Sequence, residues 1–448
     1  MPTARVAAAL VAALVCGAPE AFAQSRPGYP AVFGGAENSG PNSGGGLVLS
    51  MTVIEAHDDN LLAAAGGTPL PTTQAAGLYT SAAPQVSFQA NNRRLIFNAN
   101  ETSTFCYYPS LAETSTTNHN LGAGLSIKLG RATNLGVNQT VTYAPTYLYS
   151  LFTTPTGPTP PQVGEPAAHD PNYQTNLSLP SRTFGTNVNY SHGFNRRLSM
   201  TLRGDSARTN FVGHVPGFSD MSSSDGGGRL EYEISRGAKL HAGYTYREAS
   251  YSSAFRTKEH DIDAGIDYSR PLSASRRSTV GFSLGPTVMQ TPFVIDGNPT
   301  ASSHFRLMGD AFFEHQFGRS WSARAAYHRG ISYVAGLAGP VYNDSASAET
   351  TGFLSRRVDL SFSLAYSTGQ IASQGASAAG FTMYTADSRL RFALSREFAA
   401  LIQAIFYDYN FDQRLVIVPG VPSNFTRIGI HGGITVWVPV RSERRAAR

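Results

Sequence analysis

Apolar and polar residues alternate along most of this chain. In the segment RRVDLSFSLAYSTG, every second residue is apolar: Val358, Leu360, Phe362, Leu364 and Tyr366. The residues between them are polar or small: Asp359, Ser361, Ser363, Ala365 and Ser367. A period of two predicts a β-strand with one apolar face and one polar face.

The same alternation recurs on both sides of short turns that carry Arg. These turns centre near residues 91, 131, 195, 236, 274, 319, 356 and 396. They recur about every 40 residues, with one longer interval, which indicates an internal hairpin repeat. Eight hairpins, an opening strand over about 46–57 and a closing strand over about 424–440 predict 18 strands. The total becomes 16 if the first or a weak later segment does not pair.

Two features favour a transmembrane barrel over a soluble secreted β-sandwich. Many alternating runs extend over roughly 10–14 residues, which exceeds the common strand length of soluble sheets and suffices to cross a bilayer at a tilt. Charged residues also stand at strand centres on the polar face. The sequence therefore predicts an all-β fold, a closed antiparallel transmembrane β-barrel with short periplasmic turns and long extracellular loops.

Aromatic residues near the strand ends support this prediction. Tyr and Trp collect at the two interfaces of a membrane, where they form girdles around a barrel. The residues that we expect in such lipid-facing girdles are Tyr143, Tyr190, Tyr246, Tyr268, Tyr366, Tyr407 and Tyr409.

The chain divides into four predicted parts. Residues 1–23 have an early Arg, an apolar stretch and an Ala-Phe-Ala cleavage site, which is typical of a secretory signal peptide. Residues 24–45 form a flexible leader rich in Gly, Ser and Pro. The barrel is expected over 46–440 and a basic periplasmic tail over 441–448. The Pro-rich stretch within 151–175 cannot be a ladder strand and is a candidate for a lid or a surface contact.

The net charge does not indicate a nucleic-acid partner. The chain carries +5 at pH 7, and its tail RSERRAAR, with four Arg and one Glu, accounts for +3 of this. The remainder is nearly neutral, and export from the cell argues against nucleic acid as well. The predicted location is the outer membrane of a Gram-negative bacterium, with outer-membrane lipid as the first partner.

Charged residues on the polar faces are the main candidates for function. We expect them to line the lumen, where rings of charge set the selectivity of a pore. An equally open alternative is that they only solvate the interior or pair across strands. The candidates are Arg229, Glu231, Glu233, Lys239, His241, Arg247, Asp261, Asp263, Asp267, Arg306, Asp310, Arg324, Arg389, Arg391 and Arg427.

No catalytic, metal or cofactor site is expected. The segment HQFGRSWS contains a Ser and a His, but the turn assignment places Ser320 in a short periplasmic turn, away from the outer leaflet. His57, Asp58 and Asp59 are adjacent at a strand end and point in different directions, so they indicate a strand-to-loop boundary. We therefore predict that the protein is not an enzyme.

The end of the chain carries a second motif. In TRIGIHGGITVWVPV, residues His431, Gly433, Val436 and Val438 follow the order polar-x-Gly-x-x-apolar-x-apolar. This spacing resembles the assembly signal of outer-membrane barrels and implies the barrel-assembly machinery as a partner. The chain departs from that pattern because it continues through RSERRAAR instead of stopping at an aromatic residue.

The opening strand GLVLSMTVIEAHDDNLLAA (46–64) resembles the start of a porin-like family of outer-membrane β-barrels. The resemblance depends on an acidic cluster that follows the strand: Glu55, Asp58, Asp59 and Asn60. Genes of that family often lie near exopolysaccharide genes. The resemblance implies a channel for small solutes or glycans, linked to exopolysaccharide export. The alternative is a non-conducting outer-membrane scaffold or interaction protein of an export assembly.

Overall fold

The protein is represented by a computed structural model. It describes residues 46–60, 76–109, 114–144, 180–212, 220–235, 237–251, 255–271, 278–295, 298–317, 320–332, 341–371, 380–412 and 424–442. The predicted signal peptide and leader lie outside the described residues, as do 151–175 and most of the predicted tail. In the described part of the chain, no helix has the length and apolar character required to cross a membrane.

The described residues form eighteen strands. In chain order they are β1 (Gly46–Asp58), β2 (Gly77–Asn91), β3 (Leu95–Tyr108), β4 (Thr114–Lys128), β5 (Thr133–Ala144), β6 (Ser181–Gly193), β7 (Leu198–Phe211), β8 (Met221–Ser235), β9 (Ala238–Tyr251), β10 (Phe255–Pro271), β11 (Ser278–Ile295), β12 (Asn298–Phe317), β13 (Trp321–Ser332), β14 (Val341–Ser355), β15 (Val358–Ile371), β16 (Gly380–Ala393), β17 (Phe398–Phe411) and β18 (Asn424–Ser442).

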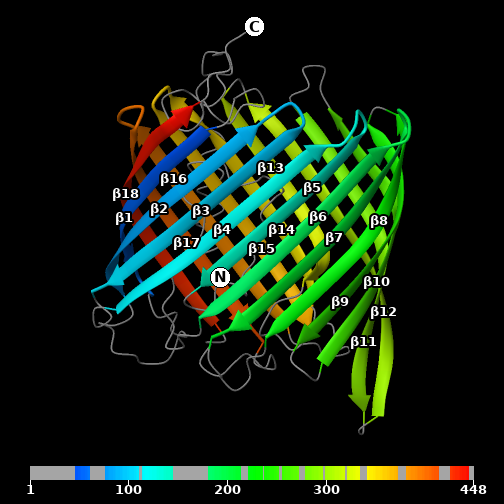
Figure 1. Cartoon of the computed structure of the whole chain (residues 1–448). Coiled ribbons are helices and arrows are strands. Elements are labelled where there is room, and N and C mark those ends of the chain that lie inside the picture. Colours follow the sequence, from blue (N-terminus) through cyan, green and yellow to red (C-terminus); the bar gives the residue numbers. More distant parts are fainter. Residues whose placement is uncertain are drawn as a thin grey trace.

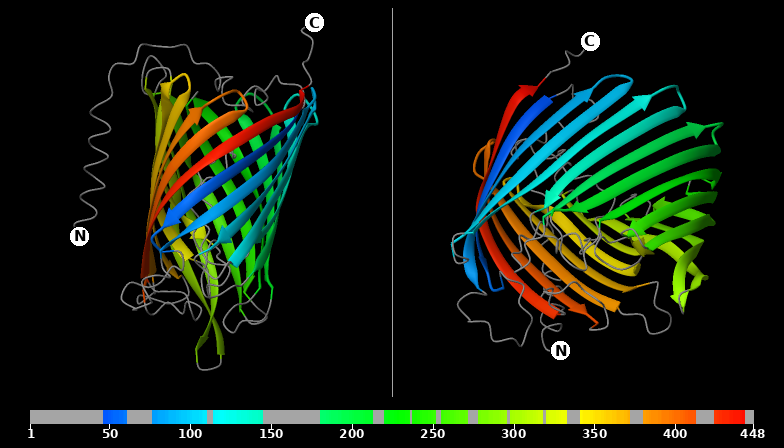
Figure 2. Two further views of the ribbon diagram at one scale, coloured as in Figure 1. Left: turned by 90° about the vertical axis from the view of Figure 1, so that its left-hand side faces the viewer. Right: turned by 60° about the horizontal axis from the view of Figure 1, so that its bottom comes forward.

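The strands form one closed sheet. Each strand pairs antiparallel with its neighbours in the sequence, and β1 pairs with both β2 and β18. The strands are strongly tilted and surround a single lumen (Figures 1 and 2). The predicted all-β closed antiparallel barrel of 18 strands is therefore confirmed, and the smaller count of 16 is wrong because the first strand pairs along its whole length.

The eight predicted turns fall between consecutive strands whose ends meet at one end of the barrel, which we call the turn end (the top of Figure 1). Residues 236, 272–277 and 318–319 of these turns lie outside the described residues. Side chains close several of the turns. In the turn at 194–197, Asn195 Oδ1 accepts hydrogen bonds from the backbone N–H groups of Arg197 and Leu198, at 2.8 and 2.9 Å. In the turn at 394–397, Ser395 Oγ similarly accepts from the N–H of Glu397 and Phe398. Local Asn and Ser side chains thus stabilise tight reversals of the chain.

The connections at the opposite end include the two longest of the chain, at 59–76 and 145–180. We call this the loop end. There, β11 and β12 extend beyond the neighbouring strands as a projecting hairpin (Figures 1 and 2).

The two faces of the sheet have opposite character, as the alternation predicts. On β15, Tyr366 faces outward with 37 % of its surface exposed, and its neighbour Ser367 faces inward with 2 % exposed. The outward residues of the other strands include many exposed large apolar side chains, for example Leu49, Ile262 and Ile434. In a bilayer every backbone N–H and C=O needs a partner, and only a closed sheet supplies this for strands. The exposed apolar face is therefore the face that contacts hydrocarbon.

The prediction that Tyr407 and Tyr409 belong to a lipid-facing girdle is wrong. Both residues face the inside of the barrel, where they are 3 % and 2 % exposed and their rings stack at 6.1 Å. The outward positions of β17 are the even-numbered ones, because Phe398 and Ile402 are exposed on the outside. Aromatic residues stand on both faces of this strand, so composition alone did not distinguish the two faces. The other five Tyr of the set lie at outward positions.

Candidate functional site

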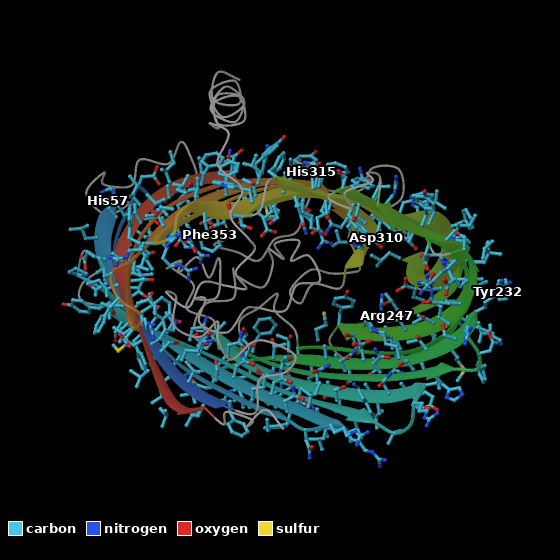
Figure 3. The ribbon with its side chains drawn as sticks, turned by 90° about the horizontal axis from the view of Figure 1, so that it is seen from above. His57, Tyr232, Arg247, Asp310, His315 and Phe353 are labelled. Atoms are coloured by element: carbon cyan, nitrogen blue, oxygen red, sulfur yellow. The ribbon has the colours of Figure 1, made fainter. Side chains whose placement is uncertain are left out.

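The inner face of the barrel is the candidate functional surface. Figure 3 looks along the barrel from the turn end and separates the two sides of the wall. His57, Tyr232 and His315 lie on the outside, and Arg247, Asp310 and Phe353 point into the lumen. The inner face has two parts of different chemistry, a charged part on β7–β10 and β12–β16 and an uncharged part on β2–β6.

The densest group of charges lies on β8, β9 and β10. Arg247 is its centre: its Nε lies 3.2 Å from Asp225 Oδ2 and its Nη1 lies 3.2 Å from Glu259 Oε2. The three side chains come from adjacent strands, because Arg247 is the register partner of Asp225 on one side and of Glu259 on the other. A single guanidinium thus joins three strands across the lumen wall.

A second network lies closer to the turn end on the same strands. Arg229 contacts Asp267, and the carboxylate of Asp267 also lies 3.1 Å from His241 Nδ1. Lys239 Nζ is 3.0 Å from Glu231 Oε2. The predicted candidates on β8–β10 therefore lie together on one wall and form ion pairs across strands.

Two further candidates on these strands, Asp261 and Glu233, lie on the same face. Asp261 accepts a hydrogen bond of 2.6 Å from Thr287 on β11. Glu233 is the register partner of Lys239. The backbone of Asp263 pairs with Gly243, but the Asp263 side chain lies outside the described ones.

Charges on β12–β16 continue around the wall. Arg324 on β13 stands between Glu314 on β12 and Glu349 on β14 in the register, and its guanidinium lies 5.3 Å from the Phe312 ring centre. Asp310 on β12 lies 2.6 Å from His328 Nδ1.

Two further arginines lie inward on β16. Arg391 binds Asp359 on β15, with its Nε 3.1 Å from Oδ2. Arg389 follows the same face and is 8 % exposed. On β12, the guanidinium carbon of Arg306 lies 4.9 Å from the centre of the Tyr342 ring, near the loop end.

The last candidate, Arg427, lies at the seam between the first and last strands. It pairs with Asp58, and both side chains are fully buried. Nearby, the Tyr79 hydroxyl and His431 Nε2 are 3.2 Å apart, and Tyr79 stacks on Tyr108 at 5.2 Å. This group packs on the lumen side of β18, β1, β2 and β3. Arg427 therefore helps to join the last strand to the first, and its buried side chain is not available to solutes in the lumen.

Sequence reasoning did not include several partners of these charges. Asp225, Glu259 and Asp359 stand at inward positions of strands that were predicted, so strand parity alone could have identified them. Asp58 was assigned to a strand-to-loop boundary, and it is the last residue of β1, but its ion pair with Arg427 was not predicted. That contact joins residues at opposite ends of the barrel sequence, and no local pattern indicates it.

A polar cluster on the outer face was also not foreseen. Glu101, at the middle of β3, faces outward, and Ser103 donates a hydrogen bond to it. Ser103 Oγ also lies 2.7 Å from His119 Nδ1 on β4. The apolar side chains of Phe97 and Phe105 lie on the same face on either side of this group. A carboxylate in the apolar band of a membrane wall is costly, so this is a local departure from the alternation.

The residues of the predicted assembly signal occupy both faces of β18. His431 and Gly433 face inward, whereas Val436 and Val438 face the lipid side. Gly433 allows close packing, because a Cβ there would lie 2.5 Å from the carbonyl oxygen of Val53 on β1. Recognition by an assembly machinery stays a prediction.

Among the described residues, no group of three or more His, Cys, Asp or Glu side chains is arranged to hold a metal ion.

Known proteins resemble this chain in architecture. No protein-family model and no curated protein sequence matches it. Among solved structures, OpdL of Pseudomonas aeruginosa aligns at 11 % identity with a TM-score of 0.42, covering 89 % of this chain and 99 % of that one. OccAB4 of Acinetobacter baumannii aligns at 11 % identity with a TM-score of 0.43, covering 89 % and 100 %.

A third solved structure was determined with a bound solute. OccK2 (OpdF) of Pseudomonas aeruginosa, in complex with glucuronate, aligns at 10 % identity with a TM-score of 0.42, covering 89 % and 98 %. Similarity this low does not assign a family or a solute to the chain.

Proposed function

We propose that the chain is a bacterial outer-membrane β-barrel and that it forms a passive, water-filled pore for small polar solutes. The proposal rests on the contrast between the two faces of the wall: charged and polar groups line the inside of a barrel whose outside is mainly apolar. A closed barrel of about 18 strands is too wide for its own strand side chains to fill. A polar interior of that width supports water and dissolved solutes. The turn end would then face the periplasm.

The inward charges would give the pore a preference for cations. On β7–β10, seven described carboxylates face inward, against four Lys and Arg side chains. Most basic groups there are neutralised by their carboxylate partners, such as Arg247 by Asp225 and Glu259. The excess negative charge attracts cations and repels anions near the wall, and salt screens this effect over about a Debye length.

Planar-bilayer recording tests this function directly. The folded protein should show stable unit conductance, and in a KCl gradient the reversal potential should indicate cation preference. The variant Glu231→Gln/Glu233→Gln removes two inward charges from β8 and should move the reversal potential toward zero. Glu248→Gln on β9 removes a charge from the outer face and is the matched control.

Folded protein without conductance would contradict the pore. It would favour the alternative, a non-conducting scaffold or interaction protein of an export assembly. One observation fits that alternative: inward side chains on β16–β18 and β1, such as Met383, Leu401 and Trp437, are almost fully buried, so this sector of the lumen is not open to solvent. A link to exopolysaccharide export remains a prediction from the resemblance of the opening strand.

A further inference from the structure

The inner face of β2–β6 carries almost no charge. Among the inward positions of these five strands, Lys128, the last residue of β4, is the one ionisable Lys, Arg, Asp, Glu or His. The others are mainly amides and hydroxyls, with amides concentrated at the centre: Asn98, Asn100, Asn118, Asn120, Asn138 and Asn187. We call this surface the amide face.

The amide face is accessible from the lumen. Asn98, Asn120 and Asn138 are all exposed, in contrast to the buried inward residues of β16–β18. Successive strand residues face opposite sides of the sheet, and Leu121 on β4 and Phe105 on β3 face the lipid side. The exposed Asn side chains therefore face the barrel interior. The amide face is therefore a polar surface in contact with the pore.

The amides converge at one point. Gly124 on β4 lies between Asn98 on β3 and Asn138 on β5 in the register. A Cβ at Gly124 would lie 2.4 Å from Asn98 Oδ1 and 2.7 Å from Asn138 Oδ1. Both amides thus reach over the glycine from opposite sides, and a side chain at position 124 would displace them. Asn138 Nδ2 also donates to Asn187 Oδ1 at 3.4 Å, which extends the row of amides to β6.

The chemistry of this surface selects among solutes. Each amide offers both donors and acceptors, and each hydroxyl offers one donor and acceptor sites. A sugar hydroxyl also donates and accepts, so it can exchange its water hydrogen bonds for bonds to the wall one by one. A charged solute gains no opposite charge here in return for lost hydration.

We propose that the amide face binds uncharged, polyhydroxylated solutes, of the class of neutral oligosaccharides, during passage. This inference rests on the proposed pore function and names a solute class for it. The charged wall on β7–β10 lies on the next part of the circumference. Ions and neutral sugars would accordingly interact with different sectors of the same lumen.

Maltotriose is a suitable probe. A poly(ethylene glycol) of similar size is the control, because the ether oxygens along the glycol chain only accept hydrogen bonds. Added to single conducting pores, maltotriose should cause concentration-dependent current blockades, and the glycol should not. The variant Asn98→Ala/Asn138→Ala should weaken the apparent affinity for maltotriose roughly tenfold, since it removes two neutral hydrogen-bonding groups. Leu121→Ala, on the lipid side of β4, should leave that affinity unchanged.

A direct binding measurement separates this inference from the pore function. Saturation-transfer NMR of maltotriose with the folded protein in detergent needs no conductance. Binding that the Asn98→Ala/Asn138→Ala variant weakens supports the amide face even if the protein does not conduct, and only the pore function then fails. Conducting pores without blockade or NMR contact overturn the inference and leave the pore function standing. Binding unaffected by a folded, conducting variant, or by Gly124→Val, which fills the point of convergence, also overturns it.

Discussion

The Asp58–Arg427 pair should carry a large share of the stability of the barrel closure. It links the first strand to the last, and both side chains are fully buried. Asp58→Ala leaves a buried guanidinium without its carboxylate, and breaking a buried ion pair in this way costs about 3–5 kcal/mol. The folding equilibrium constant would fall by about 10²–10⁴. About 1 kcal/mol of the loss comes from a second contact, the hydrogen bond from the Asn60 N–H to Asp58 Oδ1 at 2.9 Å.

A double-mutant cycle separates these contributions. Arg427→Met should also destabilise the barrel, because it leaves Asp58 buried without its partner. The double variant Asp58→Ala/Arg427→Met contains no buried charge at this place, so its loss should be smaller than the sum of the two single losses by about 2 kcal/mol or more.

Urea unfolding in phospholipid vesicles, followed by the fluorescence of the two Trp residues, measures each free energy. Glu55→Ala is the matched control, because Glu55 lies on the same strand, faces outward and holds only an exposed hydrogen bond with Thr80. Its effect should stay within about 1 kcal/mol. Equal losses in Asp58→Ala and Glu55→Ala, or strictly additive losses in the cycle, would refute the reasoning.

Three further outcomes are expected. Glu101→Leu should raise the free energy of unfolding in vesicles by about 1 kcal/mol, because it removes a carboxylate from the apolar band; a loss of stability would show that the polar cluster is structural. The variants Ile402→Trp and Tyr409→Trp, each made in a background with both native Trp replaced by Phe, compare the two faces of β17. Brominated acyl chains should quench the Trp fluorescence of Ile402→Trp and not that of Tyr409→Trp; quenching in both would place Tyr409 in lipid. Gly352→Val should lower the urea midpoint by an amount equivalent to about 1–3 kcal/mol, because a Cβ at position 352 would lie 2.0 Å from the Trp321 ring. Gly136→Ala should be tolerated, because a Cβ at position 136 would lie 3.8 Å from the nearest atom, the carbonyl oxygen of Asn189.

The sequence predicted the architecture because a membrane barrel repeats one local rule. The parity of residues such as Leu360 and Ser361 follows from the pleat, and the Arg-containing turns mark each hairpin. The count of 18 strands and the places of all eight turns depended on this local information alone.

Contacts between side chains of different strands could not be predicted in the same way. The partner of Arg427 is Asp58, which is far away in the sequence and becomes a neighbour only when β1 meets β18. Arg324 is placed between Glu314 and Glu349 only by the register of three strands. The assignment of Tyr409 to the lipid-facing girdle failed for a different reason: both faces of β17 carry aromatic residues, so aromatic character did not indicate which face is outside. The convergence of Asn98 and Asn138 over Gly124 likewise depends on register.

The central claim is that hydrocarbon covers one face of each strand and that the other face lies toward the interior. A nitroxide scan from Val358 to Tyr366 on β15, with the protein in lipid vesicles, tests it residue by residue. Collisions with molecular oxygen, which concentrates in the bilayer, should peak at the even-numbered positions, and collisions with a water-soluble nickel chelate should be strongest at odd-numbered ones. Equal access of the nickel chelate to both sets of positions would contradict a lipid-facing wall and the pore that depends on it.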